Sequence, residues 1–338
     1  MKMKILPALF FAFIIALASC SGDSSVSETK AIDSSKMRLP AELEKLNSQI
    51  IGDPSNASYY HKRAQYFLNA KSFDAGFEDM RKVMMIDSTK AEYFITLSDL
   101  YFLTNQTGSS KASLEKCIQL DDKNVTAMLK LAELYFYVKK ADKCFEYLNM
   151  ALKIDKYNPK AYFMKGMNYK ELKDTAKAIS SMQTAVEQDQ TFYNAYMQLG
   201  LLTAGQKNQL AVEYYKNALR IQPNSSEVWY GIGKFYQDVE NWEKAIEAYN
   251  VLLQIDPQNK NVQYNLAVIN MAGLKKYKIA LEYFTAAIKI DAAYVDAYFG
   301  RGVCYQEMGD KKNAKADFQA CLSINAQYEP ALKALGEK

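Results

Sequence analysis

The chain of 338 residues is poor in histidine, arginine, glycine and proline. His61 is the only histidine, which rules out most His-based zinc sites and argues against a Ser-His-Asp catalytic centre. Arginine supplies 5 of the 42 basic residues and the formal net charge is only +4, so no concentrated basic face is available for a nucleic acid. With 14 glycines and 7 prolines, the chain also lacks the turn residues of an all-β protein. We therefore expect no metal, no cofactor and no nucleic-acid partner.

The first twenty residues have the pattern of an export signal. Met1 to Lys4 is a short basic start, and the apolar run from Ile5 to Ala18 is interrupted only by Pro7. The run ends in Leu17-Ala18-Ser19-Cys20, which resembles the lipobox of bacterial lipoproteins. The resemblance implies that residues 1–19 are a cleaved signal peptide and that acylated Cys20 anchors the protein to a lipid bilayer. An ordinary secretory signal followed by a chance cysteine is the alternative.

The segment after the expected cleavage site has the composition of a tether. Residues 20–38 contain the cysteine, six serines and no aromatic residue, so this segment cannot bury enough apolar surface to fold by itself. Ser21 follows Cys20 in place of the aspartate that signals inner-membrane retention, and this resemblance favours the outer membrane. We expect a lipid-anchored protein of the bacterial cell envelope, on the periplasmic face or at the cell surface.

The rest of the chain repeats one pattern with a period close to 34 residues. Three sets of mostly small residues recur at intervals of 33 to 35. The first set is Ala64, Ser98, Ala132, Gly166, Gly200, Gly233, Ala267 and Gly302; the second is Val83, Cys117, Ala151, Ala185, Ala218, Leu252, Ala287 and Cys321; the third is Gly76, Ser110, Cys144, Ala178, Ala211, Ala245, Ala280 and Ala314. Between them, large and small apolar residues recur three and four apart, which predicts two helices in each copy.

This pattern resembles the tetratricopeptide repeat, in which 34 residues form two antiparallel helices, A and B. The first set matches the small residue of helix A, and the third set matches the small residue of helix B. The resemblance implies an all-α, right-handed solenoid over residues 57–328. The eight repeats are expected at 57–90, 91–124, 125–158, 159–192, 193–225, 226–259, 260–294 and 295–328. Capping helices are expected at 39–56 and 329–338, because each end of a stack needs a polar cover.

Two positions depart from the family's pattern. The aromatic residue expected three positions after the small residue of helix A is present in six repeats. Thr203 and Asn270 replace it in the fifth and seventh repeats. These are also the repeats with irregular spacing of the small residues.

Several features that invite a chemical interpretation are better explained by packing. The four cysteines of the repeats are Cys117, Cys144, Cys304 and Cys321, and three of them occupy slots that other repeats fill mainly with small residues. Cys304 and Cys321 are the pair that a disulfide would use. Gly231-Ile232-Gly233-Lys234 lacks the strand and the full glycine set of a phosphate loop and falls within a helix A. His61 is expected at the surface.

In this family, helix A lines the concave face through its second, fifth, ninth and twelfth positions, so these positions predict a partner-binding groove. The residues expected to line it are Ile95, Asp99, Leu129, Glu133, Phe163, Met167, Met197, Leu201, Tyr230, Tyr264, Val268, Phe299 and Val303. Phe163, Met167, Met197 and Leu201 are expected to form an exposed apolar strip. Asp99 and Glu133, with Glu92 nearby, are expected to form an acidic section. A superhelix that buries these residues against its own neighbours is the alternative.

The sequence thus predicts a scaffold or adaptor that binds a protein or peptide segment in its groove. The co-chaperone type of the family grips a carboxylate with Lys and Asn at the fifth and ninth positions of one repeat, and no repeat here has that pair. The alternative is a receptor for a small molecule or glycan that stacks on Tyr230, Tyr264 and Phe299. We expect no enzyme activity, because no set of nucleophile, base and oxyanion donors is present.

Overall fold

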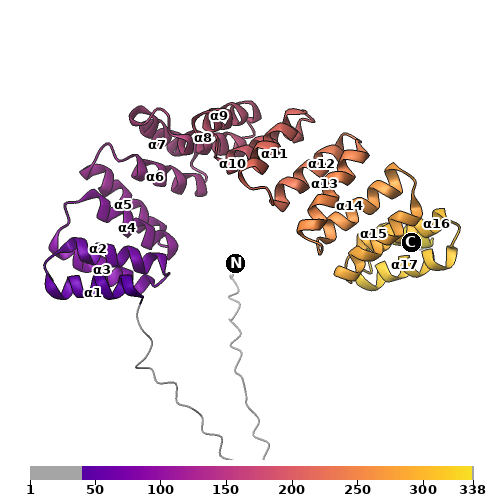
Figure 1. Cartoon of the computed structure of the whole chain (residues 1–338), viewed down its shortest axis with the longest axis horizontal. Coiled ribbons are helices and arrows are strands. Elements are labelled where there is room, and N and C mark those ends of the chain that lie inside the picture. The colour runs from indigo at the N-terminus through magenta and orange to yellow at the C-terminus, as the bar shows by residue number, and fades with distance from the viewer. Residues whose placement is uncertain (1–39, 337–338) are drawn as a thin grey trace, which may run out of the picture.

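The computed structural model describes residues 40–336, and every regular element in this range is a helix. The helices follow one another along an arch, with α1 at one end and α17 near the other (Figure 1). Their bounds are α1 (Ala41–Gly52), α2 (Ala57–Asn69), α3 (Phe73–Ile86), α4 (Ala91–Leu103), α5 (Thr107–Leu120), α6 (Val125–Tyr137), α7 (Ala141–Ile154), α8 (Pro159–Glu171), α9 (Thr175–Gln188), α10 (Tyr193–Gly205), α11 (Leu210–Ile221), α12 (Ser226–Asp238), α13 (Trp242–Ile255), α14 (Lys260–Val268) with a π-helical extension (Ile269–Gly273), α15 (Tyr277–Ile290), α16 (Val295–Glu307), α17 (Lys311–Ile324) and α18 (Glu329–Leu335).

The sixteen helices from α2 to α17 form eight antiparallel hairpins, which confirms the predicted all-α solenoid. The first helix of each hairpin begins where the corresponding repeat was expected to begin, from Ala57 to Val295. α1 packs on α2 at one end and α18 packs on α17 at the other. The expected signal peptide, Cys20 and the tether lie outside the described residues.

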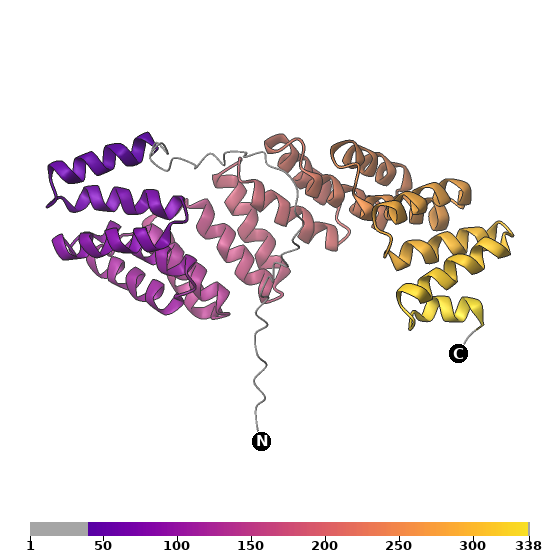
Figure 2. The same cartoon turned by 90° about the horizontal axis from the view of Figure 1, so that it is seen from below.

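Successive A helices contact one another in several places, including α2 with α4, α6 with α8, and α10 with α12. No two successive B helices contact each other to the same extent. Since the more closely spaced helices lie on the shorter path of a curved stack, the A helices form the inner side of the arch. Figure 2 shows the stack from below, running from the indigo helices at one end to the yellow helices at the other. None of the helices in residues 40–336 combines the length and apolar character that crossing a bilayer requires.

Each hairpin closes because a small residue of helix A faces a large residue of helix B. A side-chain carbon added to Gly233 would lie 2.4 Å from Cε1 of Tyr249, and one added to Gly302 would lie 2.7 Å from Cε1 of Phe318. Gly233 lies inside α12, so the glycine-rich segment at 231–234 serves helix packing rather than phosphate binding. Helices approach to about 8 to 10 Å only where such a gap exists.

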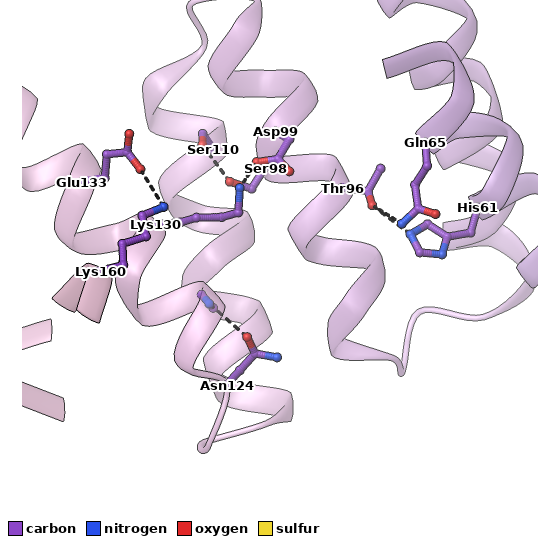
Figure 3. Close-up of polar contacts among 11 residues, drawn as sticks. His61, Gln65, Thr96, Ser98, Asp99, Ser110, Asn124, Lys130, Glu133 and Lys160 are labelled. Carbon is purple, nitrogen blue, oxygen red and sulfur yellow. Dashed lines mark hydrogen bonds and ion pairs between the residues drawn. The ribbon is translucent and has the colours of Figure 1, made fainter. Parts of the chain in front are cut away.

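The turns into helix A are closed by side chains rather than by glycine. In the third repeat, the N–H of Ala127 donates to Oδ1 of Asn124 at 2.9 Å (Figure 3), and Nδ2 of Asn124 donates to Oδ2 of Asp121 at 3.0 Å. The same Asp and Asn pairing closes the turns at 155–158 and 256–259. These caps satisfy backbone donors at the start of the helix and fix the direction from which the chain enters.

The two departures from the family's pattern are buried polar side chains that bond to their own helix. The hydroxyl of Thr203 donates to the carbonyl of Leu199 at 2.6 Å. The amide of Asn270 donates to the carbonyl of Leu266 at 2.8 Å, inside the π-helical extension that absorbs the extra residue of the seventh repeat. The aromatic residue is therefore missing only in the fifth and seventh repeats, where the small residues of helices A and B are 11 and 13 residues apart instead of 12.

The four cysteines are buried and unbonded to one another, so Cys304 and Cys321 do not form a disulfide in this structure. Burial raises the pKa of the Cys117, Cys144 and Cys321 thiols to about 11 and that of Cys304 to about 12. Each thiol is therefore protonated at neutral pH and behaves as a small apolar group in the packing.

His61 is buried, and the prediction that it lies at the surface is wrong. Its Nε2 lies 2.8 Å from Oγ1 of Thr96 on the next A helix, and its ring packs edge-on against Tyr93 (Figure 3). Burial lowers the pKa of the imidazole below its ordinary value. His61 thus fills an interface between the first two repeats instead of opening a groove.

Candidate binding groove

An open cavity of about 460 Å³ lies on the inner side of the arch, where the third, fourth and fifth repeats meet. We call it the central groove. Its lining is mainly aromatic and apolar, with three charged side chains and one amide at the rim. The lining residues are Glu133, Phe136 and Tyr137 from α6, Pro159, Lys160, Phe163, Met164 and Met167 from α8, Asp189 and Phe192 from the next turn, and Asn194 from α10.

Aromatic rings pack in pairs at the central groove and beside it. Phe163 and Phe192 have ring centroids 4.9 Å apart and tilted planes. Phe102 of the second repeat stacks on Tyr137 of the third with a centroid distance of 6.0 Å. Tyr137 is 59% exposed, which is unusual for a ring that already has an aromatic neighbour. Tyr137 and Phe102 are thus exposed, whereas Phe163 and Phe192 pack against a core cluster and reach the cavity with part of their surface.

A smaller cavity of about 140 Å³ continues the central groove toward the second repeat and shares Glu133 with it. Asp99 and Lys130 line this cavity, and their carboxylate and ammonium groups lie 2.6 Å apart (Figure 3). Lys160 lies 3.9 Å from Glu133 in the same manner. Asp99 and Glu133 are thus each paired with a lysine of the next repeat, whereas Glu92 is exposed and makes no ion pair within residues 40–336. The predicted acidic section is therefore wrong for Asp99 and Glu133.

The predicted apolar strip is only partly correct. Phe163 and Met167 line the central groove, and Leu201 is 43% exposed. Met197 is only 3% exposed, because it packs in a core cluster with side chains of α10 and α12. Leu129 is 7% exposed and belongs to the core between the third and fourth repeats. Neither residue is available to a partner.

The aromatic residues of the last three repeats do not offer open stacking faces. Tyr264 packs against Phe284 and Tyr294, and Phe299 packs against Phe318 and Tyr328. Tyr230 packs against Tyr249, and its hydroxyl lies 3.4 Å from the amide of Asn265. Ile95, Val268 and Val303 are half-buried against core clusters. The structure thus brings Glu133, Phe163 and Met167 together and leaves the other predicted residues elsewhere or inside the fold.

The sequence-based prediction missed four residues that define the groove. Phe136 and Tyr137 stand at the twelfth and thirteenth positions of α6, and Phe192 stands in the turn before α10, outside the fifth and ninth positions. Lys160 stands at the second position of α8, which the prediction did not weigh. A signal was present for two of them, since the second and twelfth positions of helix A also line the concave face in this family. Lys160 and Phe136 stand at these two positions.

A larger cavity of about 750 Å³ opens between α3 and the second repeat. Its apolar lining includes Phe77, Met80 and Met84, and its rim carries Asp74, Glu78 and Arg81. It lies on a B helix, outside the inner side of the arch, and is separate from the central groove.

The geometry defines the class of the protein as an α-solenoid of stacked helical hairpins with an aromatic inner groove. Sequence profiles described as tetratricopeptide repeat match residues 91–124, 159–192, 201–269 and 295–328. We therefore identify the chain as a solenoid of tetratricopeptide repeats. Three of the matched segments coincide with the second, fourth and eighth repeats expected from the spacing. Such solenoids are generally non-catalytic scaffolds and commonly mediate protein–protein interactions.

Solved structures of this fold resemble the chain over most of its length. The C-terminal part of a tetratricopeptide repeat-containing protein from Cytophaga hutchinsonii is 20% identical, with a TM-score of 0.63, over 70% of this chain and 98% of that one. A tetratricopeptide repeat protein from Parabacteroides merdae is 18% identical, with a TM-score of 0.50, over 73% of this chain and 97% of that one. At these identities the likeness concerns the fold alone.

Relatives in sequence share only some of the repeats. The BBSome complex member BBS4 of Xenopus tropicalis is 26% identical over 121 residues, which are 36% of this chain and 23% of that protein. The peroxisomal targeting signal receptor of Candida glabrata is 32% identical over 93 residues, which are 27% of this chain and 16% of that protein. The chain thus spans less than a quarter of the length of these relatives.

Proposed function

We propose that the protein is a lipid-anchored scaffold or adaptor of the bacterial cell envelope that holds a segment of a partner protein in the central groove. The supporting observation is the groove itself. Aromatic side chains of the third and fourth repeats meet there around a cavity large enough to take several side chains. A contiguous apolar patch of this kind on a soluble domain usually marks a binding site.

The charges at the groove favour an uncharged partner segment. The pairs Asp99–Lys130 and Glu133–Lys160 leave Asp189 as the one charge of the lining without an ion pair among the described residues. Burying a partner side chain among Phe136, Phe163 and Phe192 contributes about 1.5 to 3 kcal/mol each, before the ordering of the bound segment is subtracted. We therefore expect an affinity carried by apolar contact, with little dependence on salt.

The first test replaces Phe163 and Met167 together by aspartate. Both are half-buried lining residues, so the two new carboxylates should point into the groove and make it unfavourable for an apolar partner without disturbing the core. Crosslinking in cells followed by mass spectrometry should show that the partner bound by the unaltered protein is lost. The matched control is the pair Met85→Asp and Leu210→Asp, which are exposed apolar residues outside the groove. Unchanged partner capture by a folded Phe163→Asp, Met167→Asp protein would refute the use of the groove.

The anchoring proposal rests on Leu17-Ala18-Ser19-Cys20 and on the serine-rich segment that follows it. Several acyl chains on one cysteine give stable attachment, whereas a single chain gives only marginal attachment. The proposed site is the outer membrane, on the periplasmic face or at the cell surface.

Replacing Cys20 by alanine should move the protein from the membrane fraction to the soluble fraction after cell lysis, because the acceptor thiol is gone. Cys144→Ala is the matched control, since alanine fills this slot of helix B in most of the other repeats. Sedimentation followed by immunoblotting measures both. A Cys20→Ala protein that still sediments with membranes contradicts the anchor.

A further inference from the structure

We propose that the central groove recognises a proline-rich partner segment in the polyproline II conformation. This inference rests on the proposed function and names the chemistry of the bound segment. The aromatic rings, the spacing of the repeats, the paired charges and the hydrogen-bond donors of the groove support it.

Aromatic slots are the feature that a polyproline II segment needs most. Such segments dock in grooves lined by aromatic side chains, because proline rings pack on the aromatic rings. Here Phe163 and Phe192 form one ring pair in the lining, and Phe136 and Tyr137 line the same groove. Phe102 stacks on Tyr137 from the smaller cavity beside it, which makes the second ring pair. The two ring pairs belong to successive steps of the solenoid, so a segment that crosses the A helices meets them in order.

The spacing of the repeats agrees with the period of this conformation. A polyproline II helix rises about 3.1 Å per residue with three residues per turn, so one face recurs about every 9 Å. Neighbouring helices in contact lie about 8 to 10 Å apart. α6 contacts α8, so side chains at every third residue of the segment would fall on successive A helices.

The rim of the groove complements an uncharged segment that presents carbonyl groups. Glu133 is paired with Lys160, and Asp99 is paired with Lys130. Asp189 is the lining charge without an ion pair among residues 40–336, and its carboxylate accepts hydrogen bonds from Thr191. The hydroxyl of Tyr137 and the side-chain amide of Asn194 make no hydrogen bond with any residue of the range 40–336. Both are donors at the lining, and the free carbonyls of a polyproline II segment are acceptors.

Other backbone conformations fit this surface less well. The inner side consists of helices whose backbone groups are internally bonded, so an added β-strand finds no edge to pair with. The inner side also follows an arch (Figure 1), and a straight helix crossing four repeats departs from such a curve. A polyproline II segment of three or four residues, at about 3.1 Å per residue, spans one step of the solenoid and does not have to follow the whole arch.

The test measures the fluorescence anisotropy of labelled decaproline titrated with the full chain. Saturable binding is expected, and Tyr137→Ala and Phe163→Ala should each weaken it about tenfold or more. Tyr157→Ala is the matched control, because Tyr157 and Tyr137 are both 59% exposed and only Tyr137 lines the groove. Binding should change little between about 50 mM and about 500 mM NaCl, because no ion pair with the peptide forms.

Two outcomes overturn the inference. One is the absence of saturable binding, or equal binding of a Gly-Ser peptide of the same length. The other is displacement of the partner by an amphipathic helical peptide but not by decaproline, which would assign the groove to a helix. If decaproline fails while Phe163→Asp with Met167→Asp still abolishes partner capture, the proposed function stands and only the conformation of the segment is wrong.

Discussion

Seven of the eight turns between helices A and B place a residue with a side chain in the left-handed region of backbone space. Lys71, Lys139, Lys173, Lys207 and Lys275 have φ between 53° and 60°, and only the eighth repeat uses a glycine, Gly309. A side-chain carbon in this conformation approaches the following carbonyl and costs about 1 to 2 kcal/mol. The turns are therefore formed against a local preference, and tertiary packing of the hairpins holds them.

Replacing Lys173 by glycine should stabilise the protein by about 0.5 to 1 kcal/mol, because the relief of backbone strain exceeds the added entropy of the unfolded chain. Urea unfolding measures the change. Lys173→Ala removes the same charge but keeps the side-chain carbon, so it should leave the free energy of unfolding nearly unchanged. Equal stabilisation by both variants would show that charge, and not backbone conformation, sets the effect.

At the scale of the helical pair, the smallest residues of helix A tend to face the largest residues of helix B. The first three repeats have Ala or Ser at the crossing of helix A and Met80, Leu114 or Leu148 opposite. The fourth repeat pairs Gly166 with Met182, and the seventh pairs Ala267 with Phe284. Repeats with Gly200, Gly233 or Gly302 have a tyrosine or phenylalanine opposite, whose ring would overlap an added side-chain carbon. In these three repeats the larger ring of helix B occupies the space that the missing side-chain carbon of helix A leaves.

Gly302→Ala should destabilise the protein by about 1 to 3 kcal/mol, because the new methyl group would lie 2.7 Å from the ring of Phe318. Adding Phe318→Leu should recover part of this loss, since it reproduces the Ala132 and Leu148 pairing of the third repeat. Thermal unfolding of the two single variants and the double variant gives the coupling. Gly108→Ala is the control, because nothing lies within 4 Å of its added carbon. Strictly additive effects at 302 and 318 would contradict the size match.

The sequence predicted the hairpins well because their determinants are local and periodic. A small residue every 34 positions marks each crossing, and apolar spacing marks each helix. It predicted the groove less well, because exposure depends on which neighbour covers a side chain. Met197 and Phe163 hold the same position in successive repeats, yet Met197 enters a core cluster and Phe163 lines the cavity. The pairing of Asp99 with Lys130 spans 31 residues and joins two repeats, so the pattern within one repeat does not reveal it.

For the molecule as a whole, the stability of a stack of hairpins depends on the interfaces between neighbouring repeats. The first and last repeats have one neighbouring repeat instead of two. The first interface depends on His61, which is buried against Thr96 and Tyr93. Because burial lowers the pKa of His61 in the folded state, the unfolded chain binds the proton first as the pH falls. The stability that neutral His61 contributes is present above its unfolded pKa, near 6.5, and is lost as the pH falls below that value.

Lowering the pH from about 7.5 to about 5.5 should therefore loosen α2 to α4 while leaving α11 to α13 protected. Hydrogen exchange measured by mass spectrometry, corrected for the intrinsic rate at each pH, reports the two regions separately. His61→Gln keeps a hydrogen-bonding group for Thr96 but cannot take up a proton in this range, so its exchange should not respond to pH. A uniform response along all the repeats would contradict a role for His61.

The match between glycine and aromatic residues also extends from one repeat to the next. The ring of Tyr215 lies where a carbon added to Gly231 of the following repeat would be, and Phe284 stands in the same relation to Gly300. The corresponding positions of the second, third and fourth repeats are Thr96, Lys130 and Met164. The repeats therefore cannot be shuffled freely within the gene. A copy of the fifth repeat tolerates the sixth as its successor but would collide with the bulkier side chains near the amino terminus.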